Sequence, residues 1–178
     1  MIIVVVGYSG SNKINIGKNI AKKLDLSFCD LYNKIEEHEM LTTSEIINKK
    51  GNIFFRKIES KFLKQTIKNN KDLVLSVDEG TPCYSNNIKY INSKNVLSIY
   101  LKYSIDSLLE NILNNKIILS RYSVKYTNNQ LKEYIAKHLF ERKIYYNKCK
   151  ITIDCDKISE SEIVEKVLFK LNNSCLDL

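Results

Sequence analysis

The sequence predicts an α/β fold in which a five-stranded parallel sheet carries helices on both faces. Three observations support this fold class. Short runs rich in β-branched residues alternate with longer segments of helical periodicity, these runs are continuously apolar, and 44% of the 178 residues are hydrophobic. Continuously apolar strands are typical of a parallel sheet buried on both sides. A chain of this size can bury one sizeable core, so we expect residues 1–178 to form a single domain.

The expected strands are five short apolar runs. In chain order they are Ile2–Val6, Leu26–Cys29, Leu73–Ser76, Val96–Leu101 and Ile151–Asp154. In folds of this kind, ligands bind beyond the carboxyl ends of the strands. We therefore expect the functional residues in the loops that follow these runs.

Helical patterns fill the segments between the strands. Ile16, Ile20 and Leu24 lie one turn apart, which predicts a helix over Lys18–Leu24 with one apolar face. The remaining expected helices are Ser44 to Lys68, broken near Gly51, then Ser104–Asn114, Gln130–Lys148 and about Ser159 to Leu171.

The loop after the first strand resembles a phosphate-binding loop. Its sequence is Gly7-Tyr8-Ser9-Gly10-Ser11-Asn12-Lys13-Ile14, against the pattern G-x-x-x-x-G-K-[ST] between a strand and a helix. In that pattern, backbone N–H groups face an anion and the Lys reaches the outer phosphates. Asn12 replaces a glycine but tolerates positive φ, whereas Ile14 lacks the hydroxyl that would ligate Mg²⁺. The pattern alone supports a phosphate loop and an ordinary glycine-rich turn equally.

The net charge of +8 does not indicate nucleic acid or an anionic membrane as a partner. Lys supplies 25 of the 28 basic residues, and these lysines are spread along the chain without a basic run of five. The excess of Ile, Lys and Asn is typical of A- and T-rich codons, so the charge is read as coding bias on a solvated surface. Nucleic acid stays a weak alternative.

Cysteine usage and hydropathy suggest a reducing cytoplasm. The five Cys show no Cys-x-x-Cys spacing, and with only two distant His residues we expect no metal cage. No apolar run approaches the roughly 18 residues of a membrane span, and the apolar N-terminus is too short for a signal peptide.

Five segments occur in the order and at the spacing of one family. They are Gly7 to Lys13 with Ile16-Gly17-Lys18, Phe28-Cys29-Asp30-Leu31-Tyr32, Phe55-Arg56-Lys57-Ile58-Glu59, Val77-Asp78-Glu79-Gly80-Thr81, and Arg142 with Tyr146. On these residues the chain resembles shikimate kinase from Met1 to about Asp154. The resemblance implies a P-loop kinase fold with a mobile lid over about residues 115–128. It also implies transfer of the ATP γ-phosphate to the 3-hydroxyl of shikimate, with Mg²⁺, in chorismate and aromatic amino-acid synthesis.

The resemblance further implies roles for individual residues. The nucleotide contacts would be Gly7, Gly10, Ser11, Asn12, Lys13, Ile14, Asn15 and Lys116. Lys13 and Asp30 would be catalytic, Asp30 by organising Mg²⁺. The shikimate contacts would be Tyr32, Arg56, Glu59, Glu79, Gly80 and Arg142, the two arginines holding the carboxylate. Lys116 takes the place of a lid arginine, and Arg121 lies a few residues on. The implied partner is a small molecule, without nucleic acid or membrane, bound by a monomer.

Helical geometry gives separate support for the arginines. Arg142 falls within roughly 20° of both Leu131 and Ile135 on a helical wheel, so it projects from the packing face of its helix. A guanidinium there needs an anion, which a ligand carboxylate or an internal salt bridge to a Glu would supply. Arg56 and Glu59, three residues apart, either simply pair or pair so that Glu59 orients Arg56.

The departures from the family pattern lie at positions that are expected to contact the substrates or take part in catalysis. Ile14 has no hydroxyl, and Tyr32 stands where a second Asp would contact the substrate and serve as a base. Asp78 and Glu79 replace two glycines and add carboxylates where anions must approach, unless Lys or Mg²⁺ neutralises them. Three functions therefore stay open: a working shikimate kinase, a non-catalytic relative that binds nucleotide or a protein, and a kinase of another small hydroxylated metabolite or a nucleotide.

Overall fold

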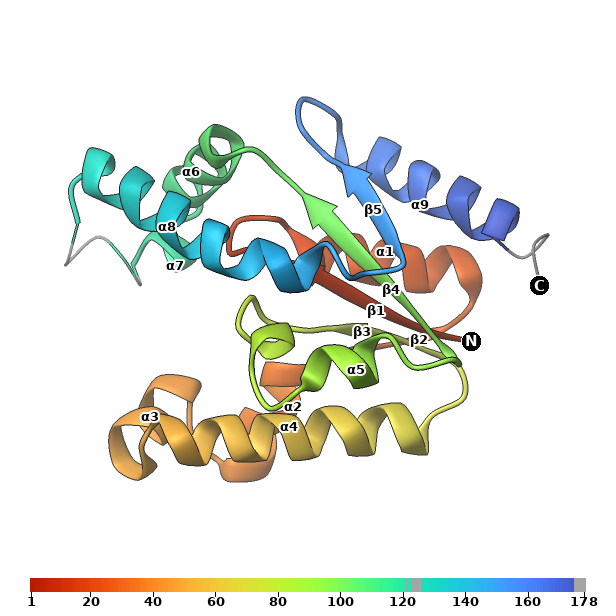
Figure 1. The fold of residues 1–178 in the computed structure, drawn as a ribbon, viewed down its shortest axis with the longest axis horizontal. Helices are drawn as coiled ribbons and strands as arrows, with labels where there is room; N and C mark the ends of the chain where they lie inside the picture. The colour runs from red at the N-terminus through yellow and green to blue at the C-terminus, as the bar shows by residue number, and fades with distance from the viewer. Residues whose placement is uncertain (121, 123–125, 175–178) are drawn as a thin grey trace.

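The fold is built on the predicted five-stranded parallel sheet. The computed structural model describes residues 1–120, 122 and 126–174. The strands lie in the order β2-β3-β1-β4-β5, and every pairing is parallel (Figure 1). Their bounds are β1 Ile2–Gly7, β2 Ser27–Asp30, β3 Leu73–Ser76, β4 Val96–Lys102 and β5 Ile151–Asp154. The prediction of the sheet is confirmed, with bounds that differ by at most one residue at an end.

Alternate residues of β1 face the two sides of the sheet, as expected for a strand buried on both faces. Ile2, Val4 and Val6 belong to one core cluster, while Ile3 and Val5 belong to another. The first cluster is covered by α2 Leu31–Glu39, α3 Thr43–Lys50, α4 Asn52–Asn69 and α5 Asn87–Ile91. The second is covered by α1 Lys13–Leu24 and α9 Glu160–Ser174, on the opposite side of the sheet (Figure 1).

A smaller third cluster lies beyond the carboxyl ends of β1 and β4. It joins Tyr8 to the apolar faces of α6 Ile105–Asn114 and α8 Asn128–Tyr146. The short helix α7, Lys116–Leu119, packs beside them (Figure 1). The lid expected over about residues 115–128 thus contains α7, but its residues 121 and 123–125 lie outside the described chain, and Arg121 with them.

The helices differ from prediction at their starts, in the short elements, and in α2, Leu31–Glu39, which no predicted helix covered. Helix α1 begins at Lys13 instead of Lys18, because Asn12 takes the left-handed conformation with φ 53° and starts the helix at once. The predicted break at Gly51 is confirmed: it separates α3 from α4 at φ 84°. Helices α5 and α7 and the 3₁₀ turn η1, Thr81–Cys83, are too short to produce a periodic pattern.

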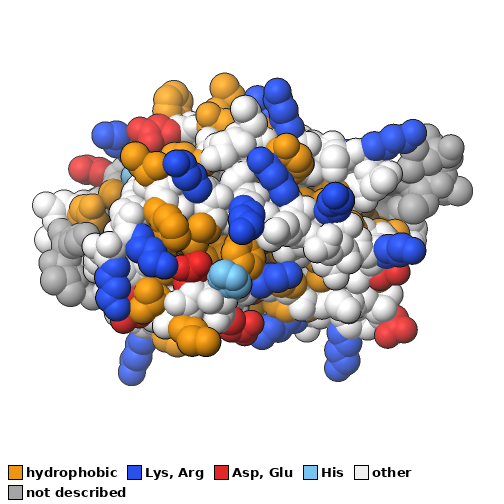
Figure 2. Space-filling model, turned by 90° about the horizontal axis from the view of Figure 1, so that it is seen from below, with side chains coloured by type: hydrophobic (Ala, Val, Ile, Leu, Met, Phe, Trp, Pro, Cys, Tyr) orange, Lys and Arg blue, Asp and Glu red, His pale blue; other side chains and the backbone are white. Residues whose placement is uncertain are grey.

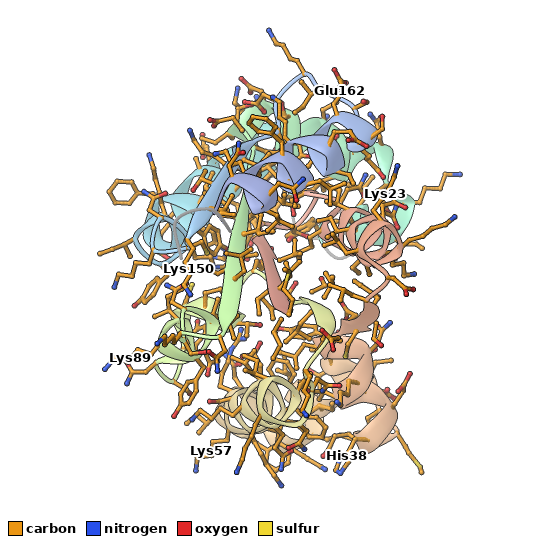
Figure 3. The ribbon with its side chains drawn as sticks, turned by 90° about the vertical axis from the view of Figure 1, so that its right-hand side faces the viewer. Lys23, His38, Lys57, Lys89, Lys150 and Glu162 are labelled. Carbon is orange, nitrogen blue, oxygen red and sulfur yellow. The ribbon has the colours of Figure 1, made fainter. Side chains whose placement is uncertain are left out.

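The lysines are dispersed over the surface. On the face shown in Figure 2, Lys and Arg side chains form separate spots among hydrophobic and uncharged ones. The exposed Lys23, Lys57 and Lys89 lie on three different helices and point outward (Figure 3). This dispersion is consistent with the interpretation of the charge as a solvated surface. Within the described residues, no helix combines the length and apolarity needed to cross a membrane.

Candidate active site

The loop after β1 has the backbone of a phosphate-binding loop. Gly10 and Asn12 both have positive φ, 85° and 53°, so the loop curls back before α1 begins. A Cβ on Gly7 would lie 2.4 Å from the Ser11 Oγ, which explains why the loop needs glycine there. The Asn111 side chain on α6 donates to the Gly10 carbonyl at 2.9 Å. The expected tolerance of Asn12 for positive φ is confirmed.

A cavity of about 610 Å³ opens beside this loop at the carboxyl ends of the strands. Seven of the site residues predicted from the sequence line this cavity, namely Gly10, Asn12, Lys13, Ile14, Asn15, Asp30 and Tyr32. Asp78 lines it on the β3 side, and Asn115, Ile117 and Ile118 line it near α7. The other wall residues are Ser9, Asn33, Glu36, Thr42, Thr43 and Ser44. The structure thus brings most of the expected nucleotide residues around one space.

Three expected nucleotide residues do not form the cavity wall. The Ser11 side chain is fully buried against Gly7, and the Ser11 N–H donates to the Tyr8 carbonyl at 3.1 Å. Lys116 is exposed on α7, and its neighbours Asn115 and Ile117 line the cavity instead. Gly7 therefore serves the shape of the loop, and Ser11 packs behind it.

Asp30 and Tyr32 stand together at the carboxyl end of β2. The Asp30 Oδ1 accepts from the N–H groups of Tyr32 and Asn33 at 3.1 and 3.0 Å, and so caps α2. The Tyr32 ring meets Phe55 edge to face at 5.3 Å. Burial raises the pKa of Tyr32 well above its ordinary value, so its phenol stays protonated at neutral pH. Tyr32 can donate a hydrogen bond there but cannot act as a base.

Three consecutive residues after β3 contact three cations from three helices. The Asp78 Oδ1 lies 3.6 Å from the Lys13 Nζ of α1. The Glu79 Oε1 lies 2.8 Å from the Arg142 Nη1 of α8. Gly80 approaches Arg56 of α4 so closely that a Cβ would lie 2.8 Å from its Nη2. We call residues 78–80 the central loop, because it links the phosphate loop to both arginines.

Arg56 is held by an acid on its own helix and by an aromatic ring. Its Nη1 donates to the Glu59 Oε2 at 2.8 Å, and the Thr81 hydroxyl donates to the Glu59 Oε1 at 2.7 Å. The Tyr84 ring lies 4.2 Å from the guanidinium carbon. Glu59 is 0% exposed, and this burial raises the pKa of its carboxyl while Arg56 opposes the shift. The expected pairing of Arg56 with Glu59 is confirmed.

Arg142 is paired with Glu79. Glu79 also accepts from the Ser9 N–H at 2.9 Å through its second oxygen, and its carbonyl accepts from the Tyr146 hydroxyl at 2.6 Å. The guanidinium carbon lies 5.5 Å from the centre of the Tyr8 ring. Of the two alternatives for Arg142, the internal salt bridge is formed, and its acid comes from the central loop instead of a neighbouring helix. Glu79 thereby bridges the phosphate loop and α8.

Gly80 lets the central loop approach Arg56 closely. We expect Gly80→Ala to lower the free energy of unfolding by about 1 kcal/mol, because the new Cβ displaces the guanidinium from Glu59 and Tyr84 while the long Arg56 side chain absorbs part of the shift. Urea denaturation measures this loss. The matched control introduces Gly80→Ala into an Arg56→Ala protein, where the clash is absent. An equal loss in both backgrounds would show that the clash is not the cause.

Sequence reasoning missed the aromatic and hydroxyl neighbours of the arginines. Tyr8 and Tyr84 face the two guanidinium groups, and Thr81 holds Glu59. The only available signal was position, since Tyr8 lies in the phosphate loop and the other two follow the central loop. Their side-chain directions depend on the tertiary fold.

Of the expected shikimate contacts, only Tyr32 lines the cavity; Arg56 and Arg142 meet the central loop, whose Asp78 does line it. A parallel sheet in this order, with a phosphate loop after its central strand and two arginines on the central loop, defines a P-loop kinase of the small-molecule class. A family model described as shikimate kinase matches residues 9–172. The chain is 42% identical to a shikimate kinase of Flavobacterium psychrophilum over 93% of this chain and 95% of the relative. The chain belongs to the shikimate kinase family.

Solved structures agree with this assignment. The chain resembles a crystal structure of shikimate kinase from Bacteroides thetaiotaomicron with a TM-score of 0.83 and 25% identity, covering 100% of this chain and 99% of the other. A shikimate kinase from Acinetobacter baumannii, solved in complex with shikimate, shares the fold with a TM-score of 0.84 at 23% identity. That match covers 97% of this chain and 93% of the other.

Proposed function

We propose that this chain transfers the γ-phosphate of ATP to the 3-hydroxyl of shikimate, as a monomeric single-domain enzyme of the cytoplasm. The observation that carries the proposal is the central loop, where Lys13, Arg56 and Arg142 converge on three consecutive residues. One cation suits a nucleotide phosphate, and two planar guanidinium groups suit a carboxylated acceptor. Family membership over nearly the whole chain supports the same substrate pair.

Phosphoryl transfer asks the protein mainly for positioning and charge stabilisation. The acceptor oxygen forms a bond to the γ-phosphorus, the bond from that phosphorus to the β-phosphate oxygen breaks and ADP leaves, and the hydroxyl proton passes to a phosphate oxygen or to water. Lys13 holds the phosphates from the start of α1, where backbone N–H groups also face the anion. Arg56 and Arg142 hold the acceptor carboxylate and so orient its hydroxyl. Tyr32 donates a hydrogen bond to the acceptor instead of removing its proton.

The oxygen donors around the cavity fit Mg²⁺. The carboxylates of Asp30 and Asp78 both line the cavity that Lys13 lines, and Mg²⁺ in proteins is held by one or two carboxylates plus substrate phosphates. When bound, Mg²⁺ neutralises charge that develops on the phosphate oxygens. Ile14, 40% exposed at the cavity, offers no oxygen in place of the hydroxyl that the phosphate-loop pattern carries.

A coupled assay of ADP formation with ATP, Mg²⁺ and shikimate tests this function. We expect turnover that depends on shikimate and falls sharply when its methyl ester replaces it, because the ester offers the arginines no carboxylate. Binding is measured in parallel by calorimetry. Shikimate binding without ADP formation at high enzyme concentration would contradict the catalytic function and favour a non-catalytic relative.

A further inference from the structure

Glu79 forms a salt bridge with Arg142, one of the two arginines that the proposed function assigns to the acceptor carboxylate. Its carboxylate oxygens accept from the Arg142 guanidinium at 2.8 Å and from the Ser9 N–H at 2.9 Å. Both side chains of the ion pair are mostly buried, each 15% exposed. A carboxylate with a charged donor and a backbone donor already has the environment that a bound substrate carboxylate would seek.

The charges around the central loop cancel. Lys13, Arg56 and Arg142 are matched by Asp78, Glu59 and Glu79, each cation having one acid within 3.6 Å. The family pattern has glycines at positions 78 and 79, so the cations at positions 13 and 142 would there lack these two acids, whereas the pair of Arg56 with Glu59 belongs to the pattern. In this chain, an acceptor carboxylate at Arg142 would lie beside the Glu79 carboxylate, and Asp78 is the residue next to Glu79 in the sequence. Like charges at that separation disfavour each other strongly in a buried site.

The contact of Glu79 with Arg142 offsets the cost of burying its carboxylate. Burial and the neighbouring Asp78 raise the pKa of Glu79 above its ordinary value, whereas Arg142, Lys13 and the Ser9 N–H oppose the shift. The carboxylate is therefore held by its donors against the cost of desolvation. An acceptor whose ring makes further contacts with the protein can place its carboxylate at Arg142 instead of Glu79. Glu79 would then turn toward Lys13 or solvent.

We propose that Glu79 is an internal competitor for the acceptor carboxylate, so that the affinity for shikimate depends on displacing Glu79 from Arg142. This inference rests on the proposed function, because it takes Arg142 as part of the acceptor site. The apparent dissociation constant for shikimate is inversely proportional to the fraction of molecules in which Glu79 does not hold Arg142. If the Glu79–Arg142 pair is formed in about nine molecules of ten, shikimate binding is weakened about tenfold, equivalent to about 1.4 kcal/mol.

The test compares Glu79→Ala with the unaltered protein by calorimetry with shikimate and by steady-state kinetics. We expect the Kd and the KM for shikimate to fall about tenfold, with the KM for ATP little changed. Glu79→Gln, which keeps the shape without the charge, should lower both constants less. Glu133→Ala removes an exposed glutamate of α8 and serves as the charge-matched control, with both constants unchanged.

A double-variant cycle separates competition from a structural role. In an Arg142→Ala background, Glu79→Ala should no longer improve shikimate binding, because the contested group is gone. If Glu79 only braces Arg142, then Glu79→Ala weakens shikimate binding, and that result overturns the proposal, as does an unchanged Kd in folded protein. Tighter binding to Glu79→Ala without ADP formation by either protein supports the competition but contradicts the kinase function. Absence of shikimate binding to both proteins overturns both.

Discussion

Replacing Lys13 with Met lowers the kcat for shikimate phosphorylation by about 100- to 1,000-fold, the usual effect of removing one group that stabilises charge in a transition state. Lys13 is the first residue of α1, and its side chain is 11% exposed beside the cavity. Among the described residues it forms a salt bridge with Asp78 at 3.6 Å, a contact that a bound phosphate can share. Steady-state kinetics with saturating ATP measures the loss.

The control for Lys13→Met is Lys22→Met, which removes the same charge from the exposed side of the same helix. Its kcat should stay within twofold of the unaltered protein, since it lies away from the cavity wall. Equal losses in both variants would mean that the net charge of the helix matters and the position of Lys13 does not.

Replacing Glu59 with Ala lowers the free energy of unfolding by about 3 kcal/mol. Glu59 is 0% exposed, and removing it leaves the mostly buried Arg56 guanidinium without its carboxylate, a change that usually costs about 3–5 kcal/mol. The low end applies because Arg56 is 19% exposed and water can reach it. For a chain of this length the melting temperature should fall by on the order of 10 °C.

Thermal and urea unfolding measure the effect of Glu59→Ala, and two variants frame the result. Glu59→Gln keeps an acceptor for the Thr81 hydroxyl and should lose less. Glu37→Ala removes an exposed acid of α2 and should change the free energy of unfolding by at most about 0.5 kcal/mol. If Glu59→Ala were no worse than Glu37→Ala, the ion pair with Arg56 would contribute nothing to stability.

The sheet and the phosphate loop could be predicted because their signals are local. The run Ile2–Val6 and the glycines that follow it are contiguous, and Asn12 is one of the residues that accept positive φ. The mostly buried position of Arg142 could be predicted from its place between Leu131 and Ile135 on one helix face.

The partner of Arg142 could not be predicted in the same way. Glu79 lies 63 residues earlier in the chain, and such a pairing leaves no periodic trace in the sequence. The same holds for Asp78 with Lys13, which meet only because β3 lies beside β1 in the sheet. The central loop was recognised as a departure from the family pattern, but its three contacts required the fold.

The central position of β1 also has a consequence for how the protein is made. This strand precedes its hydrogen-bonding neighbours in the chain by many residues, because they begin only at Leu73 and Val96. At usual rates of synthesis the strand waits on the order of ten seconds for them. An uncharged, β-branched run such as Ile2–Val6 is prone to aggregate when exposed. The interval before Val96 is synthesised is therefore the stage at which a chaperone that covers β1 would protect the chain.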